Sequence, residues 1–318
     1  MKKLVLDLDV GIDDTLAVAY ALASPEVELV GITTTYGNVT TEQSTANALA
    51  VCALLGAPDV PVYPGLPCAS FAEDFTVQPV SAFIHGKNGV GEVDVPASDR
   101  APQGQGAVDF IVEAVHRWGK DLVYVPTGPL TNLDAAIAQD PSIVDEVGAV
   151  VLMGGALTVP GNVTPWSEAN ISQDPDAADR VFRSGIPATM IGLDVTLQTL
   201  LTYRETALWR ETGTEAGKRL ADITDYYIKA YETTAPHLHG CGLHDPLACA
   251  VAVDPSLVEC LPINMMVDVE GPTRGRTIGN PELLNDPNKT MEVAVRVDVA
   301  RFLDEFMGRI TRLVSSCQ

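Results

Sequence analysis

The sequence predicts an α/β fold, a single domain in which a mostly parallel central β-sheet is flanked by helices. Short, nearly continuous apolar runs alternate with helical segments, as is typical of parallel strands covered on both faces. Polar residues follow several of these runs, which indicates a Rossmann-like core with its ligand site at the carboxyl ends of the strands. No linker-like change in composition and no internal repeat divides the 318 residues, so we expect one domain over 1–318.

The first third of the chain supplies three of the predicted strands. The expected elements are a strand over 4–6, a helix from 13, a strand over 27–34, a helix from 40 or 41 to about 55, and a strand over 60–63. Residues 64–105 are rich in Gly and Pro and lack periodicity. A loop this long in a compact chain is more often functional than idle.

The rest of the chain repeats the alternation and then changes character. We expect helices over 108–118 and 177–182, and strands over 122–125, 147–153 and 188–193. Residues 202–253 are mostly helical in pattern, and two antiparallel strands near 263–269 and 291–297 precede a final helix over 298–314. The core should therefore carry additional C-terminal helices and a small antiparallel extension.

Composition restricts the partners and the compartment. The net charge of −22 disfavours nucleic acid and anionic membranes as partners. The six cysteines contain no CxxC pair, so we expect reduced thiols rather than disulfides or a zinc site. The N-terminus has no apolar stretch of signal-peptide length, and no apolar run is long enough to span a membrane. The sequence therefore predicts a soluble, cytoplasmic protein.

Four carboxylates crowd the turn between the first strand and the first helix, at Asp7, Asp9, Asp13 and Asp14. Gly11 lies among them, where a backbone turn is expected. Anions this close repel one another, and a hard divalent cation with oxygen ligands would neutralise them. Helix capping and solvation are the alternative, but Asp7 and Asp9 precede the helix. The pattern favours a metal site.

A His-Asp-Pro segment near the C-terminal third allows two interpretations. Asp245 precedes Pro246 and an apolar helical run, a pattern typical of a helix N-cap. Beside a metal site, Asp245 would instead be a further oxygen ligand, with the titratable His244 next to it. His237 and His239 lie nearby, but the ligand spacing of a zinc site is missing, and we expect both to be exposed.

Other polar groups also follow predicted strands, at Asn38, Thr127, 162–170 and Asp194. Amides and carboxylates such as those of 162–170 suit the recognition of sugar hydroxyls, which both donate and accept hydrogen bonds. Ordinary loop chemistry is the alternative, because Asn and Gly are common turn residues. His85 lies in the long loop, in either a mobile flap or a simple glycine turn.

The opening motif resembles that of two families. A strand ending in Asp-x-Asp is similar to the haloacid-dehalogenase-like phosphatases, in which the first Asp is the nucleophile. That family also needs a downstream lysine, and Lys120 and Lys229 lie in poor contexts for this role. It also leaves Asp13 and Asp14 without a function. The phosphatase interpretation is therefore the weaker one.

The chain more closely resembles the nucleoside hydrolases, the inosine-uridine-preferring family of nucleoside N-ribohydrolases. Its opening matches their DxDxGxDD signature. Further matching segments follow in family order at 36–40, 127–132, 153–155, 161–165, 168–170, 174–178, 193–196 and 244–246. The resemblance implies an enzyme that hydrolyses the N-glycosidic bond of inosine, uridine or other pyrimidine nucleosides, in nucleoside catabolism or salvage.

The resemblance also implies a metal and a mechanism. A Ca²⁺ ion would be held by Asp9, Asp14, Asp245 and the backbone carbonyl of Thr127, with Asp7 in an outer position. Asp9 would take a proton from a calcium-bound water, which attacks the anomeric carbon through an oxocarbenium-like transition state.

Further residues around the substrate follow from the same resemblance. His244 matches the family's candidate acid for the leaving base, and His85 is the other nearby candidate. The residues matching the substrate-binding positions are Asp13, Asn38, His85, Met153, Asn162, Glu168 and Asn170.

Two departures from the family pattern lie where the base or the closing loop would be. Ala169 stands where an aromatic residue is common, and Asn88 replaces an acid in the His-Gly-x-Asp-Gly flap pattern. Base preference is therefore less secure than ribose hydrolysis. Family members are commonly homodimers or homotetramers, so we expect a homo-oligomer. A non-catalytic nucleoside- or ribose-binding protein is the alternative from another class, but it would not need the metal carboxylates.

Overall fold

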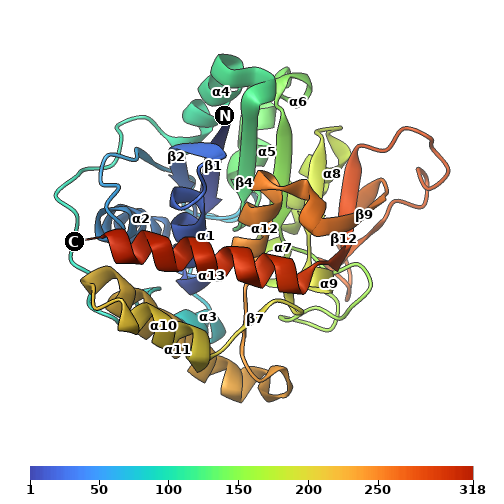
Figure 1. Ribbon diagram of the computed structural model, residues 1–318. Coiled ribbons are helices and arrows are strands. Elements are labelled where there is room, and N and C mark those ends of the chain that lie inside the picture. The colour runs from blue at the N-terminus through green and yellow to red at the C-terminus, as the bar shows by residue number, and fades with distance from the viewer. Residues whose placement is uncertain (318) are drawn as a thin grey trace.

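An eight-stranded sheet forms the centre of the computed structural model, which describes residues 1–317 (Figure 1). The strand order is β3-β2-β1-β4-β5-β6-β12-β9, and neighbouring strands are parallel except for β12 and β9. The mostly parallel sheet predicted from the sequence is confirmed. Its strands are β1 (Lys2–Leu8), β2 (Val27–Thr34), β3 (Val62–Pro64), β4 (Leu122–Pro126), β5 (Ala149–Met153), β6 (Ala188–Ile191), β9 (Val258–Pro262) and β12 (Met291–Val297).

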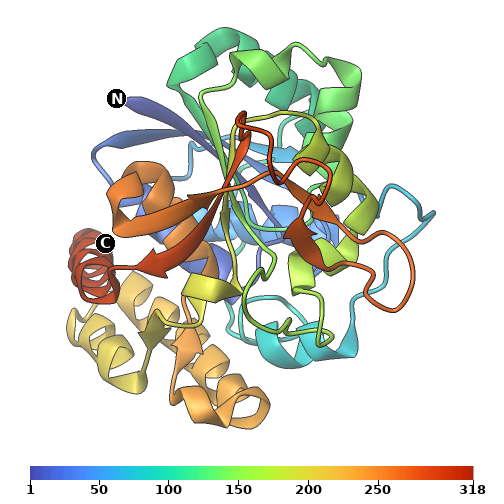
Figure 2. The same ribbon diagram turned by 90° about the vertical axis from the view of Figure 1, so that its right-hand side faces the viewer.

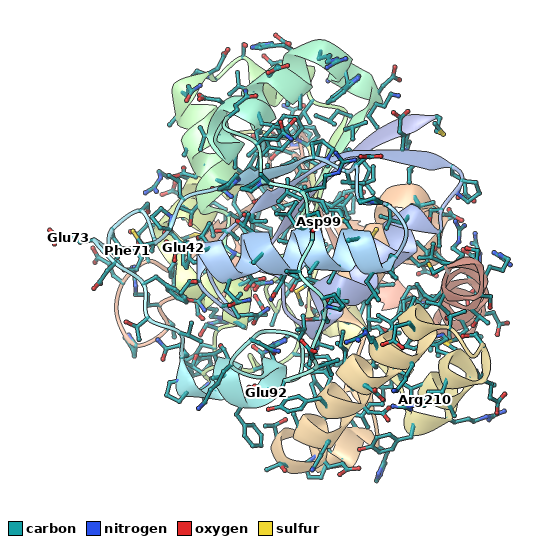
Figure 3. The ribbon with its side chains drawn as sticks, turned by 90° about the vertical axis from the view of Figure 1, so that its left-hand side faces the viewer. Glu42, Phe71, Glu73, Glu92, Asp99 and Arg210 are labelled. Atoms are coloured by element: carbon teal, nitrogen blue, oxygen red, sulfur yellow. The ribbon has the colours of Figure 1, made fainter. Side chains whose placement is uncertain are left out.

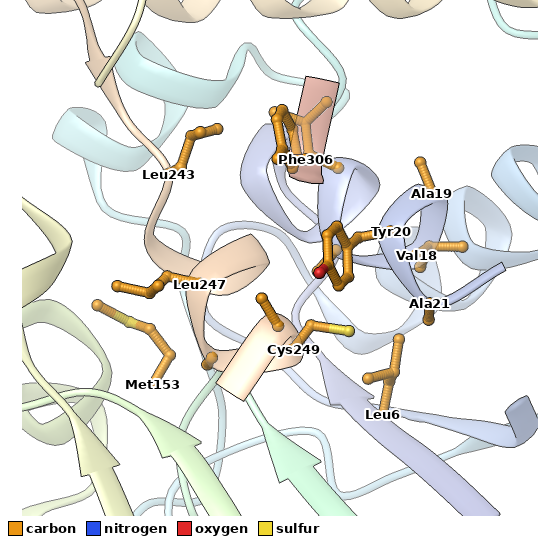
Figure 4. Close-up of a cluster of buried hydrophobic side chains, with 14 of the residues drawn as sticks. Leu6, Val18, Ala19, Tyr20, Ala21, Met153, Leu243, Leu247, Cys249 and Phe306 are labelled. Atoms are coloured by element: carbon orange, nitrogen blue, oxygen red, sulfur yellow. The ribbon is translucent and has the colours of Figure 1, made fainter. Parts of the chain in front are cut away.

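Alternate side chains of the strands enter two hydrophobic cores, one on each face of the sheet. In β1, Leu4 and Leu6 belong to the first core and Val5 to the second, because successive strand side chains point to opposite faces. Figure 4 shows part of the first core, where the rings of Tyr20 and Phe306 stack with centroids 6.2 Å apart. Both faces are therefore covered, as the apolar strands require.

Two groups of helices supply these cores. The first core receives side chains from α1 (Ile12–Leu22), α2 (Thr41–Leu54), α11 (Glu215–Thr234), α12 (His244–Val253) and α13 (Val299–Ser316). The second receives them from α4 (Ala107–Trp118), α5 (Thr131–Gln139) and α8 (Pro175–Arg183). Within residues 1–317, no helix has the combination of length and apolar character needed to cross a membrane.

The additional C-terminal helices and the small antiparallel elements were also predicted, and Figure 2 shows them beside the sheet. Helix α10 (Tyr203–Glu211) packs on α11, and β7 (Leu200–Leu201) pairs with β8 (Cys241–Gly242). A second small sheet joins β10 (Met265–Val267) and β11 (Thr277–Gly279). Short helices complete the chain: α3 (Pro79–His85), α6 (Ile143–Glu146), α7 (Ala169–Gln173) and α9 (Leu193–Thr196).

The pairing near the C-terminus differs in detail from the prediction. The antiparallel partner of β12 is β9 rather than 263–269, and β12 also lies parallel to β6 in the main sheet. The pairing of β9 with β12 extends through Pro262 to Ile263, whose N–H donates to the carbonyl of Met291 over 2.9 Å. The residues that follow form β10, which pairs with β11 instead.

The segment between β3 and α4 runs along the outside of the molecule. Figure 3 labels Phe71, Glu73, Glu92 and Asp99 along its course. This predicted loop contains α3, which the sequence analysis missed although Pro79 at its first position is a common start signal. Helix α3 ends at the buried His85, so the segment reaches the interior at that point.

Candidate active site

The acidic turn joins the end of β1 to the start of α1. Gly11 is the N-cap of α1, and its N–H donates to Oδ2 of Asp14 over 2.7 Å. A Cβ at Gly11 would lie 2.6 Å from Nδ1 of His85 and 2.7 Å from Nδ2 of Asn38. The glycine is therefore required by close packing, because real Cβ atoms do not approach other atoms this closely.

The side chain of Asp9 is buried. One of its carboxylate oxygens accepts a hydrogen bond, and the other has no hydrogen-bond partner. Oδ2 accepts a hydrogen bond of 2.7 Å from the N–H of Asn38, in the turn that follows β2. Gly37, which has a φ of +151°, allows this approach, because a Cβ there would lie 2.1 Å from Oδ2. Oδ1 is buried without a hydrogen-bond partner. That oxygen is available to a cation or to a water molecule.

Asp245 reaches the acidic turn from far along the chain, in the first turn of α12. Asp13, Asp14 and Asp245 each offer an oxygen within 4.8 Å of the others, and all three side chains are buried. Burial raises the pKa of Asp13 to about 8 and that of Asp14 to about 6. Burial, and next the charge of Asp14, raise the pKa of Asp9. A cation bound here would favour the charged carboxylates.

The donor set fits a hard divalent cation. Its members are carboxylate oxygens, and Oδ1 of Asp9 and of Asp13 are buried without hydrogen-bond partners. The tightest group of three includes Asp13 rather than the predicted Asp9. Asp9 lies close enough for the charges of Asp14 and Asp13 to affect its pKa. The structure therefore places Asp9, Asp13, Asp14 and Asp245 in one acidic cluster.

Thr127 and Asp7 support this acidic cluster from two sides. The hydroxyl of Thr127 donates to Oδ1 of Asp14 over 2.9 Å, and its carbonyl accepts from Nδ2 of Asn170 over 2.7 Å. Oδ1 of Asp7 accepts from Thr33 over 2.7 Å and from Asn132 over 2.9 Å. Asp7 thus ties β1 to β2 and to α5 beneath the turn.

A pocket of about 540 Å³ opens beside the acidic cluster. All seven residues predicted to bind the substrate line it, together with Thr127, His244 and Asp245. They come from different segments because the carboxyl ends of parallel strands share one edge of the sheet. The seven residues are Asp13, Asn38, His85, Met153, Asn162, Glu168 and Asn170.

Glu168 and Asn170 also hold the wall of the pocket together. Glu168 caps α7, with Oε1 accepting from the N–H of Asn170 and Oε2 from the N–H of Gly155, both at 2.9 Å. Nδ2 of Asn170 donates to the carbonyls of Thr127 and Met153 over 2.7 and 3.1 Å. These residues therefore orient the ends of β4 and β5 as well as facing the pocket.

His85 enters the site from the end of α3. Its Nδ1 accepts from the N–H of Ile12 over 3.2 Å, and the same nitrogen lies 3.9 Å from Oδ1 of Asp13. An accepting Nδ1 places the proton of the neutral ring on Nε2. Burial lowers the pKa of His85 to about 3, so the ring is neutral at physiological pH.

His244 lies between two hydroxyl groups. Its Nε2 is 2.7 Å from the phenolic oxygen of Tyr231, and its Nδ1 is 2.8 Å from the hydroxyl of Thr196. Burial lowers the pKa of His244 to about 4. Tyr227, one helical turn before Tyr231 on α11, donates to Oδ2 of Asp13 over 3.3 Å. The centroids of the Tyr227 and Tyr231 rings are 4.9 Å apart.

The sequence alone left open whether Tyr227 or Tyr231 reaches the base, and it gave Thr196 no role beyond its place in the matching segment 193–196. The spacing of the two tyrosines, four residues apart on a predicted helix, was the available signal, because such residues share a helix face. His237 and His239 are exposed, as predicted, and His237 lies at the edge of the pocket. All six cysteines are free thiols, also as predicted.

Comparison with known proteins places this site in a family. The sequence model of the inosine-uridine preferring nucleoside hydrolases matches residues 4–304. A probable uridine nucleosidase of Arabidopsis thaliana is 37% identical over 97% of each chain, and an inosine-uridine preferring nucleoside hydrolase of Leishmania major is 36% identical over 95% of each chain. The structure of a purine-preferring ribonucleoside hydrolase from Gardnerella vaginalis is 68% identical, with a TM-score of 0.98 over 99% of each chain. The chain is an enzyme that belongs to the inosine-uridine preferring nucleoside hydrolase family.

Proposed function

We propose that the chain is a calcium-dependent hydrolase with a preference for purine ribonucleosides. One observation carries this proposal: the buried acidic cluster opens into a pocket that is also lined by amide side chains suited to a sugar, by three histidines and by two tyrosines. A water-activating end, a sugar-binding centre and a leaving-group end thus follow one another in a single cavity. The sequence comparisons support the reaction class.

Calcium would be held by Asp9, Asp14, Asp245 and the carbonyl of Thr127, with Asp13 close beside them. The unpartnered buried oxygens of Asp9 and Asp13 support a cation at this position. When bound, such an ion supplies positive charge that orients ribose hydroxyls and makes a water molecule more acidic. Asp7 would support the cluster through Thr33 and Asn132 rather than touch the ion.

Asp9 is proposed as the general base. The N–H of Asn38 holds its Oδ2, which leaves Oδ1 free to accept a proton from the attacking water. As this proton moves to Asp9, the water oxygen forms a bond to C1′ of the ribose. The bond from C1′ to the base nitrogen breaks, and its electron pair stays with the base.

The departing base then needs a proton or a hydrogen-bond donor. Tyr231 and His244 line the pocket and lie 2.7 Å from each other, so the pair is placed to supply it. We propose that His244, the candidate acid predicted from the sequence, acts with Tyr231 as a hydrogen-bond donor to the departing base, because burial lowers its pKa to about 4 and a neutral imidazole does not give up its N–H proton. His85 faces the acidic cluster through Asp13 and is therefore proposed as a substrate-binding residue.

Purine preference is proposed, in place of the inosine-uridine or pyrimidine preference predicted from the sequence, for two reasons. Away from the acidic cluster the pocket has apolar walls, and the larger face of a purine covers more of such a surface than a pyrimidine does. The relative with 68% identity is named for its purine preference, whereas relatives at 37% identity and below include uridine and pyrimidine hydrolases. The apolar side chains are Val80, Ile84, Val159, Val163, Leu197 and Leu238.

The test is to measure ribose release from inosine, adenosine, guanosine, uridine and cytidine, with calcium and with a chelator. We expect the purine ribonucleosides to have the highest kcat/KM, and we expect the chelator to remove activity that added Ca²⁺ restores. Higher kcat/KM for uridine and cytidine would contradict purine preference. Full activity after metal removal would contradict the role of calcium. The homo-oligomeric state, whether homodimer or homotetramer, stays a prediction. The cytoplasmic location and the role in nucleoside catabolism or salvage also stay predictions.

A further inference from the structure

The short helix α9 makes hydrogen bonds to two separate parts of the chain that border the pocket. It follows β6 and carries two buried polar side chains, Asp194 and Thr196. Asp194 holds the sugar side: its carboxylate accepts from the N–H of Leu157 over 2.9 Å, and from the N–H and hydroxyl of Thr158, each over 2.6 Å. The pocket-lining residues 159–163 follow directly. Thr196 faces the other end, at His244.

The hydroxyl of Thr196 has a single hydrogen-bond partner within residues 1–317, Nδ1 of His244 at 2.8 Å. Thr196 is fully buried, and a buried hydroxyl proton needs an acceptor. Nδ1 is the acceptor in place for Thr196, whereas the hydroxyl of Tyr231 lines the pocket and can donate into it, so we assign the ring proton to Nε2. The Nε2–H then donates to the phenolic oxygen of Tyr231 over 2.7 Å. Both ring nitrogens are thereby engaged.

We propose that Thr196 is a positioning residue that fixes the orientation and the tautomer of His244, so that Nε2–H points toward Tyr231 and the leaving base. This role rests on the proposed function of His244 at the leaving-group end. It is confined to substrates whose base must be protonated or hydrogen-bonded as it departs. Asp194, on the same helix, supports the sugar side and should affect all ribosides alike.

The choice of substrate separates these roles. When the glycosidic bond of inosine breaks, the base takes the electron pair and needs a hydrogen-bond donor or a proton. In p-nitrophenyl β-D-ribofuranoside the leaving nitrophenolate is a stable anion and needs none. The ribose, the attacking water and the acidic cluster are common to both reactions. A residue that acts through His244 should therefore affect the hydrolysis of inosine and not that of the nitrophenyl riboside.

Thr196→Val removes the hydroxyl and keeps the branched shape. We expect it to lower kcat for inosine by about 10–10²-fold, part of the 10²–10⁴-fold typical of general acid catalysis. KM for inosine and kcat for the nitrophenyl riboside should change by less than about threefold if the general acid is the only catalytic group affected. Thr196→Ser restores a hydroxyl and should recover most of the inosine activity.

Asp194→Asn provides the matched control. It should raise KM for both substrates by similar factors, because it loosens the loop that faces the sugar. In addition, ¹⁵N-histidine NMR of the wild-type protein should show His244 as the Nε2–H tautomer, and Thr196→Val should shift its signals. Thermal melting confirms that each variant is folded, and Thr196→Ala replaces the valine variant if that one does not fold.

An equal loss on both substrates, or an unchanged inosine rate in Thr196→Val, would overturn the role of Thr196. An Nδ1–H tautomer of His244 in the wild-type protein would also overturn it. Wild-type protein that hydrolyses neither riboside in the presence of Ca²⁺ would instead overturn the proposed function itself. The failure of the proposed function is thus distinguishable from the failure of the Thr196 role.

Discussion

The backbone N–H of Ile12 donates to Nδ1 of His85 over 3.2 Å and so joins the acidic turn to the end of α3. The two residues are 73 positions apart in the chain. The contact orients the histidine beside Asp13, with its Nε2–H free to donate to a ligand. The packing that allows it depends on the absence of a side chain at Gly11.

Gly11→Ala should therefore lower activity strongly. Its Cβ would lie 2.6 Å from His85 and 2.7 Å from Asn38, so both side chains would have to move. We expect kcat/KM for inosine to fall by about 10²-fold, the loss that displacements of about 1 Å can cause. Gly104→Ala is the control, because a Cβ there has no atom within 4 Å. Equal activity of the two variants would contradict the packing argument.

Asp9→Ala should abolish ribose release. It removes both the unpartnered Oδ1 and the oxygen held by Asn38, and so removes the proposed base and one metal ligand. A loss of at least about 10²–10⁴-fold in kcat is expected from the base alone. Asp59→Ala, at an exposed site, should behave as wild type. Retained activity in Asp9→Ala would remove Asp9 from the mechanism.

His244→Ala should lower kcat for inosine by about 10²–10⁴-fold, as expected for loss of a general acid. Tyr231→Phe should have an effect in the same direction, because the phenolic oxygen lies 2.7 Å from Nε2 of His244. The double variant should lose little more than His244→Ala, because groups that act as a unit are not additive. Additive losses would show that the two residues act separately.

Removal of calcium should make stability fall with rising pH. Burial raises the pKa of Asp13 to about 8 and of Asp14 to about 6, above the value of about 4 for an unfolded aspartate. Between about pH 4 and pH 8, the folded, metal-free protein therefore binds more protons than the unfolded chain does. The stabilisation from these protons is complete below about pH 4 and is lost as the pH rises through 8.

Calcium should reverse this trend, because it favours the charged carboxylates. Ligand at 100 times its Kd stabilises a protein by about 2.7 kcal/mol. We expect the difference in Tm between calcium-loaded and chelator-treated protein to grow from pH 5 to pH 8. Asp14→Asn should reduce the difference. A difference in Tm that is independent of pH would contradict the linkage.

The flap residue Asn88 is expected to act on its own loop. Its Oδ1 accepts from the N–H of Val90 and of Glu92 over 3.0 and 2.9 Å, and its Nδ2 donates to the carbonyl of Val93 over 3.1 Å. Asn88→Asp keeps the acceptors and loses the donor, at a cost of about 1 kcal/mol. Hydrogen exchange of the amides over 85–93 should therefore accelerate more in Asn88→Ala than in Asn88→Asp. Equal exchange in both variants would contradict this role.

Much of the fold was predictable because it depends on local patterns. The apolar runs at 4–6 and 122–125 indicated buried parallel strands, and both lie within strands of the central sheet. The pairing of β12 with β9 was not predictable, because the mostly apolar stretch 258–269 does not reveal which of its residues will pair with β12. Helix α3 was hidden in a segment without apolar periodicity.

The sequence by itself indicated the family and the residues that we propose carry the chemistry. The spacing of Asp9, Asp13 and Asp14 around Gly11, and the ordered motifs up to Asp245, predicted the family, which the comparisons confirm, and the candidate substrate-binding residues, which stay predictions. These features are visible because they depend on neighbouring residues or on motif order along the chain.

The tertiary structure alone decided how those residues act together. The fold brings Asp245 within 4.8 Å of Asp13 and Asp14, leaves Oδ1 of Asp9 without a partner, and places Thr196 and Tyr231 on either side of His244. Hydrogen-bond partners and unpaired oxygens depend on the three-dimensional positions of side chains from separate elements. Hydrophobic periodicity indicates which face of an element is buried, but not which residue it will meet there.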